Sequence, residues 1–179
     1  MTLRTILTEP NEILRQKSKL VEEVNSEIKK LMDDMIETMY AANGIGLAAI
    51  QVGIPKRIIV IDIKKNTEDG NQVKNPMYFI NPEIVWKAEE NSIYEEGCLS
   101  VPNPFAEINR PKNCHLRYLD YNGESQLLKA EGLLATCIQH EMDHLEGILF
   151  IDYLSKLKKS MIIKKLLKQK KKNIDRIIV

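Results

Sequence analysis

The feature that most constrains this chain is a pair of histidines four residues apart, His140 and His144, in the segment QHEMDH at residues 139–144. On an α-helix this spacing places both imidazoles on one face, about 6 Å apart along the axis, so that both can bind one metal ion. Glu141 follows the first histidine and lies where it can handle the protons of a metal-bound water. The segment therefore predicts a metal-binding helix and metal-assisted hydrolysis.

Hydrophobic periodicity predicts three helices. The first, over residues 26–42, has apolar side chains at helical spacing, with its methionines as core filler, Ser26 as N-cap and Gly44 as stop. The second covers residues 132–146 and carries the histidines. The third covers residues 153–170. Its apolar residues change sides halfway along, which suggests that part of this helix serves a partner.

Short apolar runs between turn signals predict strands. They cover residues 57–63, 78–86 and 114–121, with a polar loop over residues 64–76 that turns at Asp69-Gly70 and a hairpin turn at Asn122-Gly123. These runs lie together between two helices. The order predicts an α+β fold, with mainly antiparallel sheets packed around the metal-binding helix and a helix toward each end of the chain.

Composition is that of an ordinary soluble protein. The 179 residues suit one domain; 44% are hydrophobic and 28% charged, and no apolar run approaches the roughly 20 residues of a membrane helix. The first residues do not resemble a signal peptide, and three cysteines argue against a disulfide framework. We expect a bacterial cytoplasmic protein, and a mature organellar form stays an open alternative. One catalytic domain over residues 1–152, followed by a C-terminal helix and tail over 153–179, is the expected organisation.

Two histidines need a third protein ligand, because catalytic metal sites usually have three. No histidine follows His144, and Asp152 is a weak candidate. Cys137 shares the face of His140 but is seven residues from His144, about 10 Å along a helix, which is too far for three donors to converge. Cys114 falls in a strand pattern as buried filler. Cys98, preceded by a glycine that permits close backbone approach, is the better candidate.

Three segments together resemble motifs of the peptide deformylase family. They are GIGLAAIQ at residues 44–51, EGCLS at 96–100 and QHEMDH at 139–144, in the family's order and at familiar spacing. The likeness extends over nearly the whole chain. It implies hydrolysis of the formyl group from the N-terminal formylmethionine of newly made polypeptides, which yields formate and a free amine.

The resemblance also implies the ligands and the catalytic groups. Cys98, His140 and His144 would hold one divalent metal, with Fe²⁺ the expected physiological ion and Zn²⁺, Ni²⁺ or Co²⁺ possible in purified protein. Glu141 would transfer the water's proton to the leaving amine. The Gln51 amide and the Leu99 backbone N–H would stabilise the tetrahedral oxygen.

Further residues are expected to bind substrate. The backbone of Gly44, Ile45 and Gly46 would pair with an extended peptide, and Leu133, Thr136, Cys137 and the Ile45 side chain would form the methionine pocket. Arg110 is expected to contact the substrate main chain or carboxylate, whereas Glu96 is expected to be structural and to hold a nearby arginine or backbone N–H.

Some positions depart from the common family pattern. Residues 103–105, Asn-Pro-Phe, stand where many bacterial relatives have an arginine, and Tyr94 and Thr136 replace residues that are frequently smaller or more apolar. These departures leave the expected chemistry intact. They concern the preference at and beyond the methionine pocket.

The C-terminal tail is basic. Residues 156–172 contain nine lysines and no acid, so with a net charge of +1 the other 162 residues carry −8. Lysine clusters bind phosphate backbones without sequence preference, and the family resemblance suggests ribosomal RNA near the peptide exit. We expect nascent formylmethionyl peptides and the ribosome as partners, and neither DNA nor membranes.

Two other functions remain open at this stage. A zinc peptidase that cuts internal peptide bonds is disfavoured, since no downstream ligand follows the histidine motif. A non-enzymatic ribosome-binding protein with a relic site is disfavoured because every catalytic position is filled.

Overall fold

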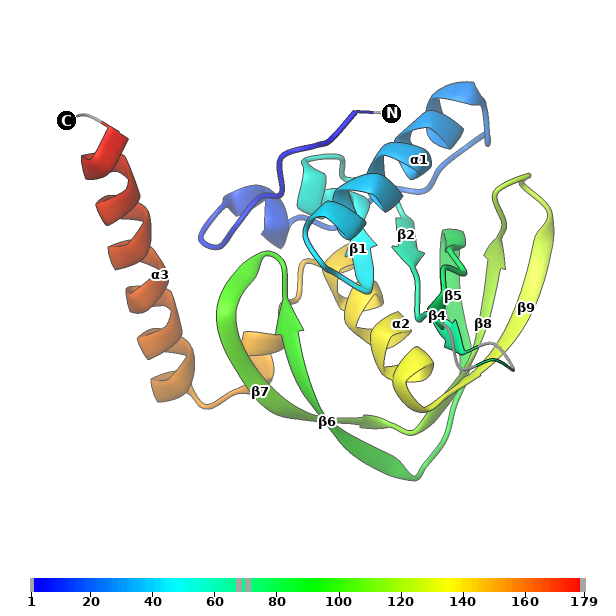
Figure 1. The fold of residues 1–179 in the computed structure, drawn as a ribbon. Coiled ribbons are helices and arrows are strands. Elements are labelled where there is room, and N and C mark those ends of the chain that lie inside the picture. The colour runs from blue at the N-terminus through cyan, green and yellow to red at the C-terminus, as the bar shows by residue number, and fades with distance from the viewer. Residues whose placement is uncertain (1, 67–68, 70–71, 178–179) are drawn as a thin grey trace.

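The computed structural model describes residues 2–66, 69 and 72–177, and its framework is a five-stranded antiparallel sheet (Figure 1). The sheet has the spatial order β1 (Gly46–Ala48), β2 (Ile58–Ile61), β5 (Met77–Lys87), β8 (Asn113–Leu119) and β9 (Ser125–Glu131). A separate hairpin pairs β6 (Asn91–Cys98) with β7 (Val101–Pro111), and a short one pairs β3 (Lys65–Asn66) with β4 (Gln72–Val73).

Three α-helices and three 3₁₀ turns complete the described chain. The helices are α1 (Ser26–Ala41), α2 (Gly132–Leu145) and α3 (Lys156–Ile177); the 3₁₀ turns are η1 (Glu12–Arg15), η2 (Ala49–Val52) and η3 (Phe150–Tyr153). The predicted α+β class with mainly antiparallel sheets is confirmed. In the part of the chain that the structure describes, no helix has the length and apolarity needed to cross a membrane.

The large sheet is buried on both faces along strand β2. Ile58 and Val60 belong to a core shared with α1, whereas Ile59 and Ile61 belong to a second core shared with α2. Side chains alternate between faces along a strand, so a strand covered on both sides must be apolar at every position. This accounts for the unbroken apolar run of β2 and places α1 and α2 on opposite faces (Figure 1).

Helix α2 occupies the centre of the molecule, between the large sheet and the β6–β7 hairpin (Figure 1). Every residue from Ala135 to Glu141 is buried, a run that covers all sides of the helix. The polar motif therefore lies in a packed interior, as the predicted fold required.

Several element boundaries differ from the predicted ones. Asn25, not Ser26, caps α1, because its side chain accepts hydrogen bonds from the free N–H groups of residues 27 and 28 in the first turn. The last helix begins at Lys156 rather than Tyr153, since residues 150–153 form a separate 3₁₀ turn and Ser155 Oγ accepts from Lys158 N–H at the helix start.

The strand prediction was incomplete. The β6–β7 hairpin and strand β9 were not predicted, because their mixed polar and apolar residues lack a clear alternation. Strands β1, β3 and β4 were not predicted because they are only two or three residues long. The hairpin turn at Asn122-Gly123 is confirmed, with Gly123 at a φ of 84°. The predicted Asp69-Gly70 turn lies partly outside the described residues.

A third core joins α3 to the rest of the fold. Leu166 is buried against Val101 and Ile108 of β7 and against Phe150 and Ile151 of η3. The first half of α3 is thus packed behind the β6–β7 hairpin. The division of the chain at residue 152 stays a prediction.

Candidate functional site

Cys98, His140 and His144 converge in the interior. One donor atom from each lies within 4.8 Å of the others, and Cys98 Sγ is 3.2 Å from His144 Nε2. Both histidines are buried, and their ring centroids are 5.1 Å apart. One thiol and two imidazoles are the donor set of a tetrahedral catalytic site with one open position, so the residues present fit a divalent metal.

Two elements bring these donors together. The histidines are one helical turn apart on α2, and Cys98 is the last residue of β6. The β6–β7 register is irregular between Glu96 and Cys98, and such irregularities re-aim a side chain at the end of a strand. The structure therefore explains how a residue 42 positions before His140 reaches the helix.

The environment of His144 favours metal binding. Burial, aided by the neighbouring positive charges of His140 and Arg110, lowers the pKa of His144 well below its usual value. The imidazole is then neutral, which is the form that binds a metal. Among the residues that the structure describes, its buried Nδ1 has no hydrogen-bond partner.

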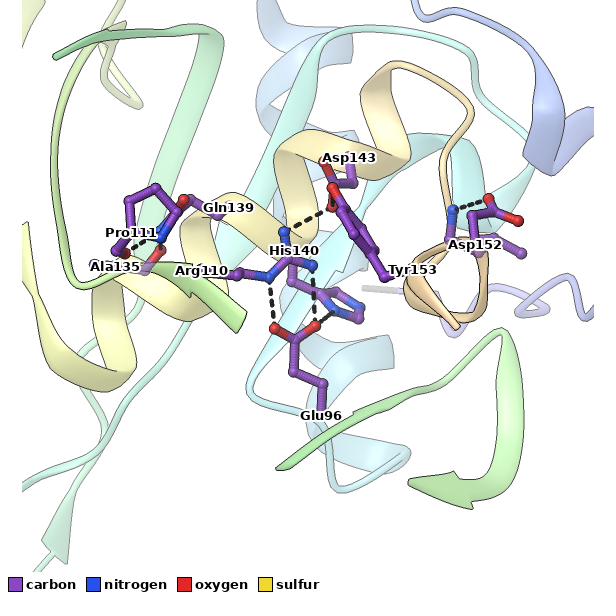
Figure 2. A network of polar contacts seen from close by, with 10 residues as sticks. Glu96, Arg110, Pro111, Ala135, Gln139, His140, Asp143, Asp152 and Tyr153 are labelled. Atoms are coloured by element: carbon purple, nitrogen blue, oxygen red, sulfur yellow. Dashed lines mark hydrogen bonds and ion pairs between the residues drawn. The ribbon is translucent and has the colours of Figure 1, made fainter. Parts of the chain in front are cut away.

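A buried network of charged side chains contacts His140 at its Nδ1 (Figure 2). Glu96 Oε2 lies 2.8 Å from His140 Nδ1, which leaves Nε2 for the metal. Arg110 donates to both Glu96 oxygens, at 2.5 and 3.0 Å, and to Asp143 Oδ2 at 2.8 Å. Tyr153 donates its hydroxyl to the same Asp143 oxygen at 2.9 Å.

This network corrects the expectation for Arg110. The arginine is buried and lies on the far side of His140, outside the cavity described below, so its guanidinium orients Glu96 instead of meeting substrate. Asp143 and Tyr153 were not predicted as part of the site. The position of Asp143 inside the histidine motif was the one available signal, because that placement keeps it within a turn of both ligands.

Glu141 has the environment of a proton-transfer group. Burial, partly offset by His140, raises the pKa of Glu141 to about 7. Its Oε2 has no hydrogen-bond partner in the described part of the chain, and a Cβ built on Gly46 would lie 2.4 Å from its Oε1. The glycine therefore leaves the space that the carboxylate occupies. A carboxyl with a pKa near 7 can both accept and return a proton at neutral pH.

Gln51 is held with its amide toward the same centre. Its Oε1 accepts from Ala48 N–H at 2.7 Å, and its Nε2 donates to Ser100 Oγ at 3.0 Å and lies 3.6 Å from Cys98 Sγ. The donor end of the amide thus points to the metal-ligand side. Leu99 follows Cys98 at the turn into β7 and also borders the site.

A cavity of about 480 Å³ opens onto these groups. All the expected substrate-binding residues except Arg110 line it: Gly44, Ile45, Gly46, Leu133, Thr136 and Cys137. Thr136 and Cys137 are buried at its inner wall, whereas Ile45 and Leu133 are exposed at its mouth. Tyr94, Asn103 and Phe105, which the sequence linked to the preference at and beyond the methionine pocket, also line the cavity, as does Pro102, which sequence reasoning did not identify.

The other ligand candidates lie elsewhere. Cys114 is buried in the core between the sheet and α2, and Asp152 is paired with Arg15 and Lys159. Cys137 lines the cavity but is not among the converging donors.

Comparisons with known proteins agree on one family. The family described as "Polypeptide deformylase" matches residues 3–160. The chain is 67% identical over 179 residues to a peptide deformylase of Pelagibacter ubique, with 100% of each covered. It is similar to the crystal structure of a peptide deformylase from Ehrlichia chaffeensis (TM-score 0.91, 44% identity, 97% of this chain and 99% of that one). A second structure from Ehrlichia chaffeensis, in complex with actinonin, gives a TM-score of 0.89 at 46% identity, covering 94% and 98%.

Proposed function

Because the chain belongs to the peptide deformylase family, we infer that it is a metal-dependent hydrolase that removes the N-formyl group from the N-terminal formylmethionine of newly made polypeptides and releases formate. The observation that carries this function is the convergence of Cys98, His140 and His144 beside Glu141, at the inner end of a cavity.

Cys98, His140 and His144 hold the metal in this proposal. We propose Fe²⁺ as the native ion, as the family resemblance implies; the mixed thiolate and imidazole donors would also suit Zn²⁺, Ni²⁺ and Co²⁺. When bound, such an ion supplies Lewis-acid chemistry, which polarises a carbonyl and lowers the pKa of water. Glu96 and Arg110 keep His140 in the orientation that the ion requires.

The remaining catalytic groups act on protons and charge. Glu141 accepts a proton from the attacking water and returns it to the amine as the C–N bond of the formamide breaks, an assignment that its raised pKa supports. The Gln51 side chain and the Leu99 N–H are the proposed donors to the developing oxyanion, and the anchored amide of Gln51 supports its part.

The substrate enters as an extended chain. We propose that it pairs with the backbone of residues 44–46 at the edge of β1, because that strand is the last of its sheet and borders the cavity. The methionine side chain occupies the inner pocket with Leu133, Thr136 and Cys137. Recognition of main chain with one anchoring side chain suits an enzyme that must accept many sequences.

The basic surface of α3 is proposed to contact the ribosome. Lys164, Lys165 and Lys168 are exposed, on a helix whose apolar side is packed against β7. Replacing these three lysines by Gln should weaken ribosome binding at low salt while formate release from a short peptide stays unchanged. The matched control replaces Lys87, Lys112 and Lys129, which are exposed elsewhere. Equal binding by both variants would contradict the proposal. We also propose a cytoplasmic location, because the proposed partner is the ribosome.

The activity is tested by formate release from formyl-Met-Ala-Ser, with protein prepared without air and loaded in turn with Fe²⁺, Ni²⁺ or Zn²⁺. Release that is fast with Fe²⁺ and abolished by Glu141→Gln supports the function and the metal together. Cleavage of unformylated peptides would favour the peptidase alternative, and folded, metal-loaded protein without any turnover would favour the relic ribosome binder.

A further inference from the structure

A second cavity, of about 500 Å³, lies against a different face of α2 from the catalytic one. Its α2 side is formed by Gln139, Met142, Asp143 and Glu146, and none of these four residues lines the catalytic cavity. Cavities that bind small molecules have volumes of roughly 300–1,000 Å³, so the second cavity is large enough to hold a ligand. The deformylase reaction gives it no role.

Gln139 supplies one hydrogen-bond acceptor at the wall of the second cavity. Its side chain is buried, 3% exposed, and its Nε2 donates to the backbone carbonyls of Pro111 and Ala135 at 2.9 and 3.0 Å (Figure 2). These two bonds fix the orientation of the amide, because only its NH₂ end can donate. No donor from the described residues reaches Oε1. Buried polar groups usually have partners, so an unpaired acceptor at a cavity wall points to a ligand.

Asp143 supplies a second acceptor one helical turn further along α2. Its Oδ2 accepts from Arg110 and Tyr153, whereas its Oδ1 receives no hydrogen bond from the part of the chain that the structure describes. Side chains four residues apart on a helix have Cβ atoms about 5–6 Å apart. A guanidinium group donates in a fixed planar fork, so it can bridge two acceptors at this spacing.

The other walls of the second cavity suit a cation on an apolar stem. Asp143 and Glu146 lie at the C-terminal end of α2, where the helix dipole favours positive charge. Glu83 adds a carboxylate that is 67% exposed. The partly buried side chains of Ile84 and Met142 offer apolar surface on which methylene groups can pack.

Three cationic side chains also line the second cavity, and their charges are accommodated without the two free acceptors. Arg57 is paired with Glu146, and Arg110 is held by two carboxylates. Lys87 is exposed, so its ammonium group can extend into water. Gln139 Oε1 and Asp143 Oδ1 therefore remain available to an occupant.

We propose that the second cavity binds the guanidinium group of an arginine, with Gln139 Oε1 and Asp143 Oδ1 as its acceptors. The methylene stem of the arginine packs on Ile84 and Met142. This site is separate from the deformylase reaction, although an occupant binds the same carboxylate as Arg110.

The test is an NMR titration of zinc-loaded protein with L-arginine and with acetyl-arginine amide, whose backbone charges are removed. A Kd on the order of 1 mM is expected for a ligand of this size. L-Citrulline has the shape of arginine without its charge, and L-lysine lacks the planar fork, so both should bind about tenfold more weakly. Binding of both arginine compounds would indicate an arginine within a polypeptide as occupant, and binding of L-arginine alone would indicate the free amino acid.

Variants place the bound arginine in the second cavity. Asp143→Asn removes the charge and keeps the shape, so it should weaken binding about tenfold. Glu83→Lys changes an exposed residue, serves if Asp143→Asn does not fold, and should weaken binding about two- to fivefold, less so at high salt. The matched control is Glu124→Gln, an exposed carboxylate outside the cavity, which should bind arginine like the wild type. The side-chain NH₂ signals of Gln139 should shift during the titration.

The tripeptide Met-Ala-Ser, a product of the proposed reaction, separates the two cavities. Saturation with Met-Ala-Ser should leave the affinity for arginine unchanged, and displacement of arginine would overturn the proposal by placing it in the catalytic cavity. Equal binding of L-arginine and L-citrulline, or wild-type affinity in both Asp143→Asn and Glu83→Lys, would also overturn it. These measurements do not involve formate release, so their failure would leave the proposed function unaffected.

Discussion

Replacing Arg110 by Met should destabilise the fold strongly. Arg110 and Glu96 are both only 5% exposed and form a bidentate pair, and Arg110 also binds Asp143. The substitution leaves the Glu96 carboxylate buried with His140 as its remaining partner. Because breaking a buried pair by removing one member costs about 3–5 kcal/mol, we expect the free energy of unfolding to fall by that amount.

Urea denaturation at pH 7 measures this loss. Both proteins must be metal-free, since a bound ion would add its own binding energy to the stability of the folded state. The matched control is Arg117→Met, whose pair with Glu83 is long (3.6 Å) and exposed (61% and 67%). Exposed pairs contribute at most about 1 kcal/mol, so the control should change little.

A double variant tests the cause. If the uncompensated Glu96 charge is responsible, Glu96→Gln should cost less stability in the Arg110→Met background than in the wild type. Metal affinity of Arg110→Met should fall about 10- to 100-fold, as expected when the support of a ligand is lost. Equal losses of less than 1 kcal/mol in Arg110→Met and Arg117→Met would refute the reasoning.

Three further outcomes follow from single sites. Gly46→Ala should lower kcat for formate release about 100-fold or more and destabilise the fold by about 1–3 kcal/mol, because the new Cβ would meet Glu141 Oε1 at 2.4 Å and Cys137 Sγ at 2.9 Å; normal turnover would contradict this. Asp34→Asn should lower stability at pH 7. The Thr2 N–H and neighbouring cations lower the pKa of Asp34 to about 2 from 3.8, so the Asp34 carboxylate contributes to the free energy of unfolding above pH 4. The stabilities of the wild type and Asp34→Asn should therefore converge as pH falls toward 2. A constant difference in stability between the two proteins in acid would exclude this. Adding Zn²⁺ should raise the Tm of the metal-free wild type and leave Cys98→Ser nearly unchanged, whereas equal shifts in thermal melts would speak against Cys98 as ligand.

Short-range patterns were enough to predict much of this protein. The histidine motif and helix α1 follow from side-chain spacing on a helix, and β2 follows from its apolar run. These signals lie within one element, where periodicity reports burial directly. The β6–β7 hairpin was not predicted because even the inner face of its strands is only partly buried. The alternation of polar and apolar residues along these strands is therefore weak.

Residues far apart in the chain required the tertiary structure. Cys98 was a candidate from its chemistry and from the family resemblance, and the fold brings it 3.2 Å from His144. Arg110 was expected to contact substrate, and its buried position beside Glu96, behind His140, follows from the packing of β7 against α2.

The sequence by itself determined the metal-binding helix, the α+β class and the family, since local spacing and matching motifs carry that information. Only the tertiary structure decided which side chains surround the site: Glu96 and Arg110 behind His140, and Phe105 at the mouth of the cavity. The physical reason is that these contacts depend on strand register and on the packing of α2 between two sheets, which no local pattern specifies.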